Sequence, residues 1–397
     1  MMAAIRSAQL GQEVSLIEKN SLPGRKLLLS GKGRCNLTNA CDLNSFISRF
    51  NSGGQFLRDA FKIFFTRDLM RFFEERGLRL KVERQLRVFP ESDRSASILE
   101  ILEKELRLLK VKTFFNCQIR DILVRNGRVE ALVTSRGENI PADRVILATG
   151  GASYKFTGST GEGFAIAEKL GHRIIGLQPG LVPFLTKERY AGLEGLTLRN
   201  IRLKFSSGKK KIVSEIGELL FTGSGVSGPL VLSLSSRLSG LLENNALLRM
   251  EIDLKPALTP EQIDARLLRE FSRESKKSIR NLMKLLLPAS LAETLLKIAG
   301  IDLQKRANQV TQAERIKLAA MLKAFPLEIK GSAPLEEAMV TRGGVCLKQI
   351  NPRTMESRLV KGLYFAGEMI DADADTGGFN LQAAFSTGYL AGQSASS

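Results

Sequence analysis

The chain has 397 residues, with 43% hydrophobic and 25% charged side chains, a composition typical of a globular protein with a large core. No apolar run reaches the ~20 residues of a membrane span, and no signal-peptide pattern opens the chain, so we expect a cytoplasmic protein without a membrane partner. Lys and Arg (59) outnumber Asp and Glu (41), and the net charge of +18 favours partners that carry phosphate groups. Four cysteines without a C-x-x-C pair and a single histidine argue against a dithiol reductase and against a metal site.

The first predicted elements are a helix over residues 2–9 and a strand over residues 13–18 that ends in the acid Glu18. In a Rossmann βαβ unit, such an acid binds a ribose hydroxyl and follows a glycine-rich turn by about 20 residues. Counting back from Glu18 places that turn before Met1. We therefore expect a strand and a glycine turn upstream of Met1, which implies a start codon assigned too late or a truncated chain.

Residues 24–36 read Gly-Arg-Lys-Leu-Leu-Leu-Ser-Gly-Lys-Gly-Arg-Cys-Asn and predict an anion-binding loop. The glycines let the backbone wrap around an anion, while Arg25, Lys26, Lys32 or Arg34 neutralises its charge. A solvent-exposed basic loop without a ligand is the alternative. Cys35 is either a proton donor beside a ligand or a small buried residue.

The middle of the chain alternates helices and strands. Residues 46–86 are predicted to be helical, with phenylalanines that form core rather than stack on bases, and residues 95–109 form the next helix. A strand over 111–115 precedes a hairpin of residues 119–124 and 129–134, whose turn is the Asn126-Gly127 pair. A buried strand over 144–151 ends in two glycines, and residues 158–163 open another helix. His172 follows this helix, where we expect a C-cap or surface position.

From about residue 187 the pattern changes. Strands are predicted over 196–205, 211–216 and 247–254, helices over 259–324, and strand again over 327–345. Residues 223–228 fit the G-x-G-x-x-G pattern of a second nucleotide-binding turn, but no further α/β repeat follows them. We interpret this region as an insertion, because a ligand-binding motif lies on each side of it.

The C-terminal motif begins with a buried strand over residues 363–366, followed by Gly367, Glu368 and an acidic turn. Residues 376–382, Thr-Gly-Gly-Phe-Asn-Leu-Gln, then open a helix whose first N–H groups can hold anionic or electron-rich oxygens. A glycine-punctuated turn without a ligand is the alternative.

The loop at 24–36 and the stretch at 362–382 resemble the YhiN/BaiN-like family of FAD flavoproteins, and the resemblance extends over nearly the whole chain. It implies an α/β fold: a Rossmann-type FAD-binding domain of the two-dinucleotide-binding flavoprotein group with an inserted β-barrel and a small all-α insert. The implied bounds are 1–186 and 345–397 for the FAD-binding domain, 187–258 and 325–344 for the barrel, and 259–324 for the helical insert. Residues 223–228 are then part of the barrel.

The resemblance also implies site residues. Cys35 and Arg34 are the catalytic candidates, and NAD(P)H is the expected transient hydride donor. The implied FAD-binding residues are Glu18, Arg25, Lys26, Ser30, Gly31, Gly33, Arg34, Asn36, Ile119, Ala148, Thr149, Gly150, Gly367, Glu368, Asp371, Thr376, Gly377, Gly378, Asn380 and Leu381.

The family resemblance and the charge together favour an oxidoreductase that reduces a uridine of large-subunit (23S) ribosomal RNA to dihydrouridine. Two alternatives stay open: a reductase of a small enone or ketone, and an RNA-associated flavoprotein without turnover. Basic residues of the insertion are the candidate RNA contacts, and four of them, spaced i, i+4, i+7 and i+11, are expected on one helix face, with a solvated basic face as the alternative. The candidates are Arg199, Arg202, Lys209, Lys210, Lys211, Arg273, Lys277, Arg280 and Lys284. The sequence leaves open the choice between NADH and NADPH, the proton donor and the oligomeric state.

Overall fold

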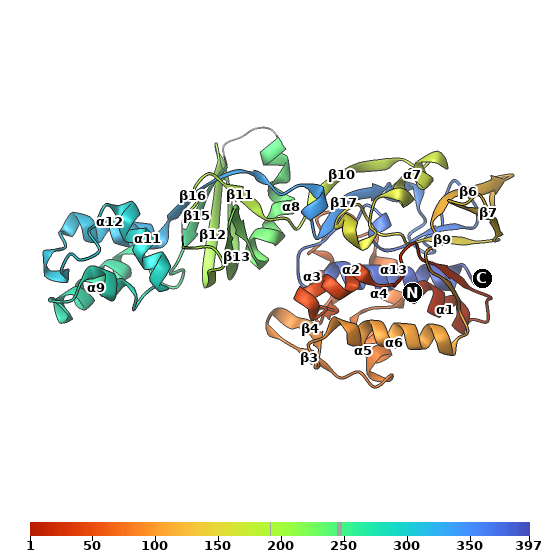
Figure 1. Ribbon diagram of the computed structural model, residues 1–397, viewed down its shortest axis with the longest axis horizontal. Coiled ribbons are helices and arrows are strands. Elements are labelled where there is room, and N and C mark those ends of the chain that lie inside the picture. Colours follow the sequence, from red (N-terminus) through yellow and green to blue (C-terminus); the bar gives the residue numbers. More distant parts are fainter. Residues whose placement is uncertain (191, 244–247) are drawn as a thin grey trace. The chain divides into compact units, whose positions relative to one another are not determined.

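A computed structural model (Figure 1) describes residues 1–190, 192–243 and 248–397, and divides the chain into two compact units. Unit 1 comprises residues 1–181 and 334–397, and unit 2 comprises residues 182–333. The sequence-based boundaries were 186/187 and 344/345. The second differs by eleven residues because the strand β17 (Val340–Val345) pairs with β10 (Ile174–Gly180) in unit 1, not with strands of the barrel.

Unit 1 contains two pairs of parallel strands. Strand β1 (Ser15–Ile17) pairs with β5 (Lys112–Phe114), and β9 (Val145–Leu147) pairs with β18 (Leu363–Phe365). All three residues of β18 are buried, as expected for a strand covered on both faces. Pairing between β9 and β18 joins segments more than 200 residues apart, so the two parts of the chain that flank unit 2 form one structure.

Three antiparallel sheets complete the strands of unit 1: β2–β4–β3, β6–β7–β8 and β10–β17. The hairpin predicted around Asn126-Gly127 is confirmed as β6 and β7, and both turn residues have positive φ angles (52° and 72°), as a two-residue hairpin turn requires. The bounds are β2 Thr38–Asn39, β3 Leu80–Val82, β4 Arg87–Pro90, β6 Ile119–Arg125, β7 Arg128–Thr134 and β8 Asn139–Pro141.

Helices cover the parallel strands. Helix α1 (Met2–Gln9) crosses α13 (Phe379–Ser394) closely, since the Ser7 hydroxyl donates to the Gly392 carbonyl (2.8 Å). The region 46–86, predicted as continuously helical, contains two helices that are followed by strand β3. The other helices of unit 1 are α2 (Arg25–Leu29), α3 (Leu43–Ile47), α4 (Arg58–Ile63), α5 (Thr66–Glu74), α6 (Ser95–Leu108) and α7 (Glu162–Lys169).

Unit 2 contains a closed six-stranded barrel in the order β11–β14–β13–β12–β15–β16. Its strands are β11 (Phe184–Thr186), β12 (Thr197–Ser207), β13 (Lys210–Thr222), β14 (Gly225–Ser227), β15 (Leu248–Asp253) and β16 (Phe325–Ser332). The segment 223–228 contains the link after β13 and the strand β14, which pairs antiparallel with β13, and this confirms that the glycine-rich segment belongs to the barrel and not to a Rossmann unit. Helix α8 (Pro229–Glu243) follows.

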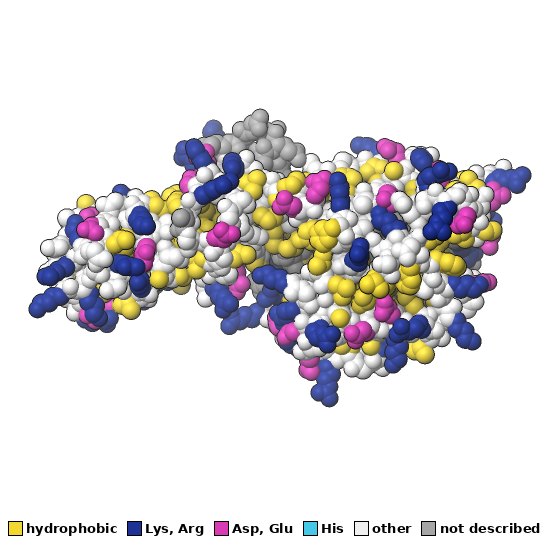
Figure 2. Space-filling view, viewed as in Figure 1, with side chains coloured by type: hydrophobic (Ala, Val, Ile, Leu, Met, Phe, Trp, Pro, Cys, Tyr) yellow, Lys and Arg dark blue, Asp and Glu magenta, His cyan; other side chains and the backbone are white. Residues whose placement is uncertain are grey.

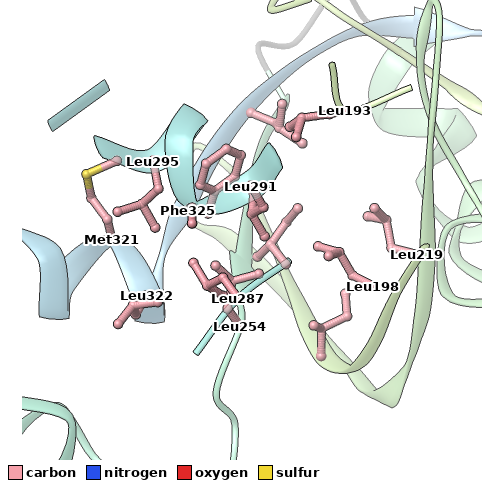
Figure 3. Close-up of a cluster of buried hydrophobic side chains, with 14 of the residues drawn as sticks. Leu193, Leu198, Leu219, Leu254, Leu287, Leu291, Leu295, Met321, Leu322 and Phe325 are labelled. Carbon is pink, nitrogen blue, oxygen red and sulfur yellow. The ribbon is translucent and has the colours of Figure 1, made fainter. Parts of the chain in front are cut away.

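Four helices lie between β15 and β16: α9 (Pro260–Arg273), α10 (Ile279–Met283), α11 (Ala289–Ala299) and α12 (Gln312–Lys323). Their apolar side chains share one buried cluster with those of the barrel, so Leu291 and Leu295 of α11 belong to the same core as Leu198 and Leu219 (Figure 3). The helical segment therefore completes the core of the barrel unit and does not form a third compact unit. None of the helices in the described ranges is long and apolar enough to cross a membrane.

Candidate functional site

An ion pair joins the two motifs that the sequence analysis placed at opposite ends of the chain. The Lys26 ammonium on α2 lies 2.6 Å from a carboxylate oxygen of Glu368, in the turn after β18. Both side chains are only about a quarter exposed (26% and 21%), so this charge-assisted contact is shielded from much of the solvent. The structure thus brings together two predicted FAD-binding residues that are 342 positions apart.

Two residues that the sequence analysis missed complete this network. Ser153 accepts a hydrogen bond from the Lys26 ammonium (2.8 Å), and the Thr341 backbone N–H donates to Glu368 (2.6 Å). The Thr341 hydroxyl accepts from the N–H groups of Ala152 (2.8 Å) and Ser153 (3.1 Å). Ser153 and Thr341 carry no motif, and only the neighbouring glycine pair at 150–151 marks this place in the sequence. A Cβ at Gly151 would lie 2.9 Å from the Glu368 carboxyl carbon and closer still to the Thr341 hydroxyl, so the network requires glycine there.

The main chain is accessible where β9 ends. Ala148 and Thr149 are exposed, and Gly150 has a φ of +79°. Gly367 (φ +67°) lies two residues after the end of the adjacent parallel strand β18, and its N–H donates to the Thr387 hydroxyl (2.9 Å). Because the carboxyl ends of parallel strands meet at one edge, these residues lie at the edge where open α/β sheets bind ligands.

The basic loop contacts the start of α13 through Asn36 and Gly378. With its amide oriented to satisfy both partners, Asn36 donates to the Thr38 carbonyl and accepts from the Gly378 N–H, each at 3.2 Å. A Cβ at Gly378 would lie 2.7 Å from Thr38 Cα, and Gly378 has a φ of +96°, so only glycine allows this approach. Thr38 in turn donates to Gln382 (2.6 Å), which ties the loop to the first turns of the helix.

Glu18 follows β1 directly and fixes the turn after it. One carboxylate oxygen accepts from both the backbone N–H and the side-chain amide of Asn20, each at 2.8 Å. Arg25 donates to the side-chain amide oxygen of Asn20 (3.2 Å). Glu18, Asn20 and Arg25 therefore form one connected polar group at the end of β1.

The two catalytic candidates lie in contrasting surroundings. The Arg34 guanidinium binds Glu83 and Asp93 (2.7 Å to Asp93) and stacks over Phe89, 4.2 Å from the ring centre. Hydrogen bonding to Glu83 raises the pKa of Arg34 and lowers that of Glu83. Cys35 is fully buried, and burial raises the pKa of its thiol to about 11, so it stays protonated at neutral pH. The burial agrees with the interpretation of Cys35 as a small buried residue, and the alternative, a proton donor beside a ligand, stays a prediction.

The acidic turn before α13 is held by its own polar contacts. Asn380 binds the backbone N–H of Ala374 (3.0 Å) and its carbonyl (2.9 Å), so its amide shapes the turn. Burial raises the pKa of Asp371, and the nearby Asp373 adds to this effect. Asp373 is 2% exposed and accepts from Asn51 at 2.8 Å.

The remaining predicted FAD-binding residues lie on three further segments. Ser30 donates to the Leu27 carbonyl (2.6 Å) at the end of α2, and Gly31 and Gly33 follow it with exposed backbone and positive φ angles (57° and 83°). Thr376 and Gly377 precede α13, and Leu381 lies in its first turn. Ile119 begins β6 and pairs with Thr134.

The expectation of four cations on one helix face is wrong. Helix α9 ends at Arg273 and α10 begins only at Ile279, with Ser278 as its N-cap, so Lys277 lies between the helices and Lys284 just after the second. Pairing of residue 278 with 306 separates the two helices. All four of these cations also pair with carboxylates: Arg273 with Glu270 (2.6 Å), Lys277 with Glu274 (3.0 Å), and Arg280 and Lys284 with Glu293 (2.6 and 3.9 Å).

The barrel candidates differ in accessibility. Lys209, Lys210 and Lys211 are exposed at the turn between β12 and β13, and within the described ranges they form no ion pair. Arg199 lies 3.7 Å from Glu218, and Arg202 lies opposite Asp253 on the neighbouring strand. The three lysines, which we call the hairpin lysines, are therefore the candidate contacts with the least internal charge compensation.

The residues of unit 1 fit the FAD that the resemblance implies. Arg25, Lys26 and the exposed glycine backbone around residue 31 are suited to a diphosphate, and Glu18 is suited to a ribose. Glycine at 150, 151 and 378 lets the backbone pack directly against other residues of this site, and Gly367 has a positive φ that favours glycine. Within the described ranges, no group of three His, Cys, Asp or Glu side chains is placed to hold a metal ion.

Comparison with known proteins agrees with this arrangement. The sequence matches the family described as HI0933-like protein Rossmann domain over residues 1–394. It is 31% identical to a 3-dehydro-bile acid delta(4,6)-reductase of Clostridium scindens, covering 100% of this chain and 96% of the relative. It is 28% identical to a ribosomal RNA dihydrouridine synthase of Escherichia coli, covering 99% and 94%, and 27% identical to one of Haemophilus influenzae, covering 98% and 94%.

Two solved structures share the fold. One is a 3-ketosteroid-delta4-(5alpha)-dehydrogenase from Rhodococcus jostii RHA1, with a TM-score of 0.53 and 16% identity over 100% of this chain and 94% of that chain. The other is a 3-ketosteroid delta1-dehydrogenase from Sterolibacterium denitrificans, with a TM-score of 0.52 and 13% identity over 100% and 97%. At these identities the likeness establishes the fold alone.

Proposed function

Because this chain belongs to the HI0933-like Rossmann family of FAD-binding flavoprotein oxidoreductases, we propose that it reduces a uridine of large-subunit ribosomal RNA to dihydrouridine. In this proposal the protein is cytoplasmic, and NAD(P)H supplies the reducing equivalents. The names of the Escherichia coli and Haemophilus influenzae relatives support this substrate.

The single observation that carries the RNA substrate is the accessible positive charge. The net charge is +18, and Figure 2 shows many Lys and Arg side chains on the surface, interspersed with fewer Asp and Glu side chains. The hairpin lysines add three adjacent, exposed cations without an internal ion pair in the described ranges. Contacts of this kind bind RNA phosphates and position the strand, although they do not select a base.

The residues of this chain would hold FAD and shape its surroundings. Arg25 and Lys26 would neutralise the diphosphate, and Glu18 would accept from a ribose hydroxyl. Glu368 keeps the Lys26 ammonium in place through their 2.6 Å contact. Bound FAD supplies the hydride chemistry. Cys35 stays a candidate proton donor, because its thiol keeps its proton at neutral pH.

A second candidate is the reduction of a small enone, which the name of the Clostridium scindens relative favours. The two substrates share one reacting group. In uridine and in an unsaturated 3-ketosteroid alike, a C=C bond is conjugated to a carbonyl, and its reduction adds hydride at one carbon and a proton at the other. A flavin site of one design therefore serves either substrate, and the binding surface decides between them.

The test compares the two substrates directly. The purified protein with FAD and NAD(P)H is incubated with large-subunit RNA from cells lacking the gene, or with a steroid dienone, and NAD(P)H oxidation is followed. We expect RNA-dependent oxidation and dihydrouridine in the recovered RNA. Oxidation with the steroid alone would make the enone reductase the correct assignment.

Neutralising the hairpin lysines tests the RNA contact itself. The variant Lys209→Gln, Lys210→Gln, Lys211→Gln should weaken RNA binding and reduce the slope of log K against log salt by about one unit per lost contact. A matched control neutralises three exposed lysines of unit 1, with the same change in net charge: Lys62→Gln, Lys112→Gln and Lys169→Gln. Equal effects of the two variants would mean that net charge alone, and no contact at the hairpin, attracts the RNA.

A further inference from the structure

Unit 2 contains a pocket of about 200 Å³ beside the link between β13 and β14. The glycine-rich segment that fits G-x-G-x-x-G contributes Gly223 and Gly225 to its lining. The volume is below the roughly 300–1,000 Å³ of pockets that enclose a whole ligand, so it suits one part of a ligand. Neither the barrel core nor the FAD-binding residues of unit 1 account for this pocket.

Hydrogen-bonding groups of both kinds line the pocket. Glu188 and Glu194 provide carboxylates, and Thr222 and Tyr190 provide hydroxyls. The Thr222 hydroxyl oxygen is buried and has no hydrogen-bond partner within the described ranges. A buried hydroxyl without a partner is costly, so this atom indicates a place for a polar ligand atom or a bound water. Burial, together with Glu188, raises the pKa of Tyr190 to about 12, so its hydroxyl stays a donor at neutral pH.

The rest of the lining includes apolar side chains and one cation. Leu193, Phe221 and Leu327 provide an apolar wall, and Arg189, which is exposed, is the cation among the lining residues. A ligand that fits needs hydroxyl or amino groups for the carboxylates and an apolar ring face for the wall. An adenosine has these features, because its ribose carries the hydroxyls and its adenine has the flat ring face, and the phosphate attached to the ribose would suit Arg189.

We propose that this pocket binds the adenosine ribose of the nicotinamide dinucleotide that drives the reaction, and that it selects NADH over NADPH. Glu188 and Glu194 accept hydrogen bonds from the 2′- and 3′-hydroxyls, as an acid does in other NAD sites. The 2′-phosphate of NADPH would face two carboxylates and one cation, and repulsion from the carboxylates disfavours it. This proposal rests on the proposed use of NAD(P)H and adds where the donor binds and which donor it is.

The variants must avoid the glycines that build the barrel. A Cβ at Gly225 would lie 2.9 Å from the Thr186 backbone nitrogen and closer still to the Phe184 carbonyl, so alanine there disrupts the pairing of β11 with β14. Glu188→Gln and Glu194→Gln keep the shape of the side chain and remove its charge. Glu188→Gln also keeps an acceptor for the Glu328 N–H, which Glu188 now binds at 2.8 Å.

Calorimetric titration of the full-length protein, with its FAD already reduced and oxygen excluded so that the ligands bind without reacting, tests the proposal; the ligands are NADH, NADPH and a single-stranded uridine oligonucleotide. We expect NADH to bind more tightly than NADPH, and each Glu→Gln variant to bind NADH about tenfold more weakly, the usual loss for a hydrogen bond to a charged group. Glu251→Gln, an exposed carboxylate on β15 outside the pocket, serves as the matched control and should bind like the wild type. Thr222→Val should weaken NADH binding without lowering the melting temperature, because its hydroxyl has no internal partner in the described ranges.

Three results would overturn the proposal: no NADH binding by the wild type, equal NADH affinity in the wild type and the Glu variants, or NADPH bound at least as tightly as NADH. Competition of the uridine oligonucleotide for the Glu188 and Glu194 sites would assign the pocket to the RNA instead. NADH binding that depends on these residues, in a protein that does not reduce RNA, would refute the proposed substrate and leave the pocket assignment standing.

Discussion

Replacing Gly378 by alanine tests the contact that joins the basic loop to the start of α13. Gly378 has a φ of +96°, and an added Cβ would lie 2.7 Å from Thr38 Cα and nearer to the Thr38 carbonyl group. Left-handed backbone costs a residue with a side chain about 1–2 kcal/mol, and the overlap must in addition displace β2 or α13. We therefore expect the free energy of unfolding to fall by about 3 kcal/mol or more, which is within the range of severe single substitutions.

Gly137→Ala separates the two contributions. Gly137 also has a positive φ (86°), but nothing lies within 4 Å of an added Cβ, so only the backbone strain of about 1 kcal/mol should appear. Urea denaturation followed by circular dichroism measures both losses, and flavin absorbance measures the FAD bound per chain. We expect Gly378→Ala to lose bound FAD and Gly137→Ala to retain it. Equal losses of stability, with FAD retained in both variants, would refute the reasoning.

Three further predictions concern single groups of unit 1. A double-mutant cycle of Lys26→Met and Glu368→Gln should show a coupling in the free energy of unfolding of about 1 kcal/mol or more, because both side chains are only about a quarter exposed. A coupling below about 0.5 kcal/mol would contradict a shared network. Burial lowers the pKa of His172, so at a pH just below the ordinary histidine pKa of about 6.5 the unfolded chain binds more protons than the folded chain. The free energy of unfolding should therefore fall as the pH drops through that value. The variant His172→Gln should remove this pH dependence. Cys35, with its pKa raised to about 11, should resist alkylation at neutral pH until the protein unfolds, and rapid labelling of the native protein would show that the thiol is accessible.

The sequence predicted the elements that depend on residues close together in the chain. The Asn126-Gly127 turn is an example, because the positive φ angles of a two-residue hairpin turn select these residue types. Asn36 and Gly378 were both assigned to the FAD site, but the contact between them was not predicted. Lys26 and Glu368 were both assigned to the FAD site, but their direct ion pair was not foreseen.

The parts that the sequence did not predict depend on long-range pairing. Strand β17 looks like any barrel strand in sequence, and only its hydrogen bonds to β10 place Thr341 beside Glu368. His172 was expected at a C-cap or on the surface. It follows the end of α7, but it is 2% exposed and contacts Ser357 at 2.8 Å, a residue 185 positions away.

The break between α9 and α10 did have a local signal. Ser278 has the extended conformation of an N-cap (φ −66°, ψ 145°), and serine is a favoured residue at that position. Regular spacing of the basic residues suggested one continuous helix and outweighed this signal. The break matters for function, because it places on separate segments the cations that were expected to bind RNA together.

The most direct test of the proposed function is the amount of dihydrouridine in large-subunit ribosomal RNA from cells with and without this gene. The proposal predicts that deletion removes one dihydrouridine and that the wild-type gene restores it. The gene with the three hairpin lysines replaced by glutamine should restore less than the matched control with Lys62, Lys112 and Lys169 replaced. An unchanged dihydrouridine level after deletion would contradict the proposal and leave the reduction of a small enone as the function to test.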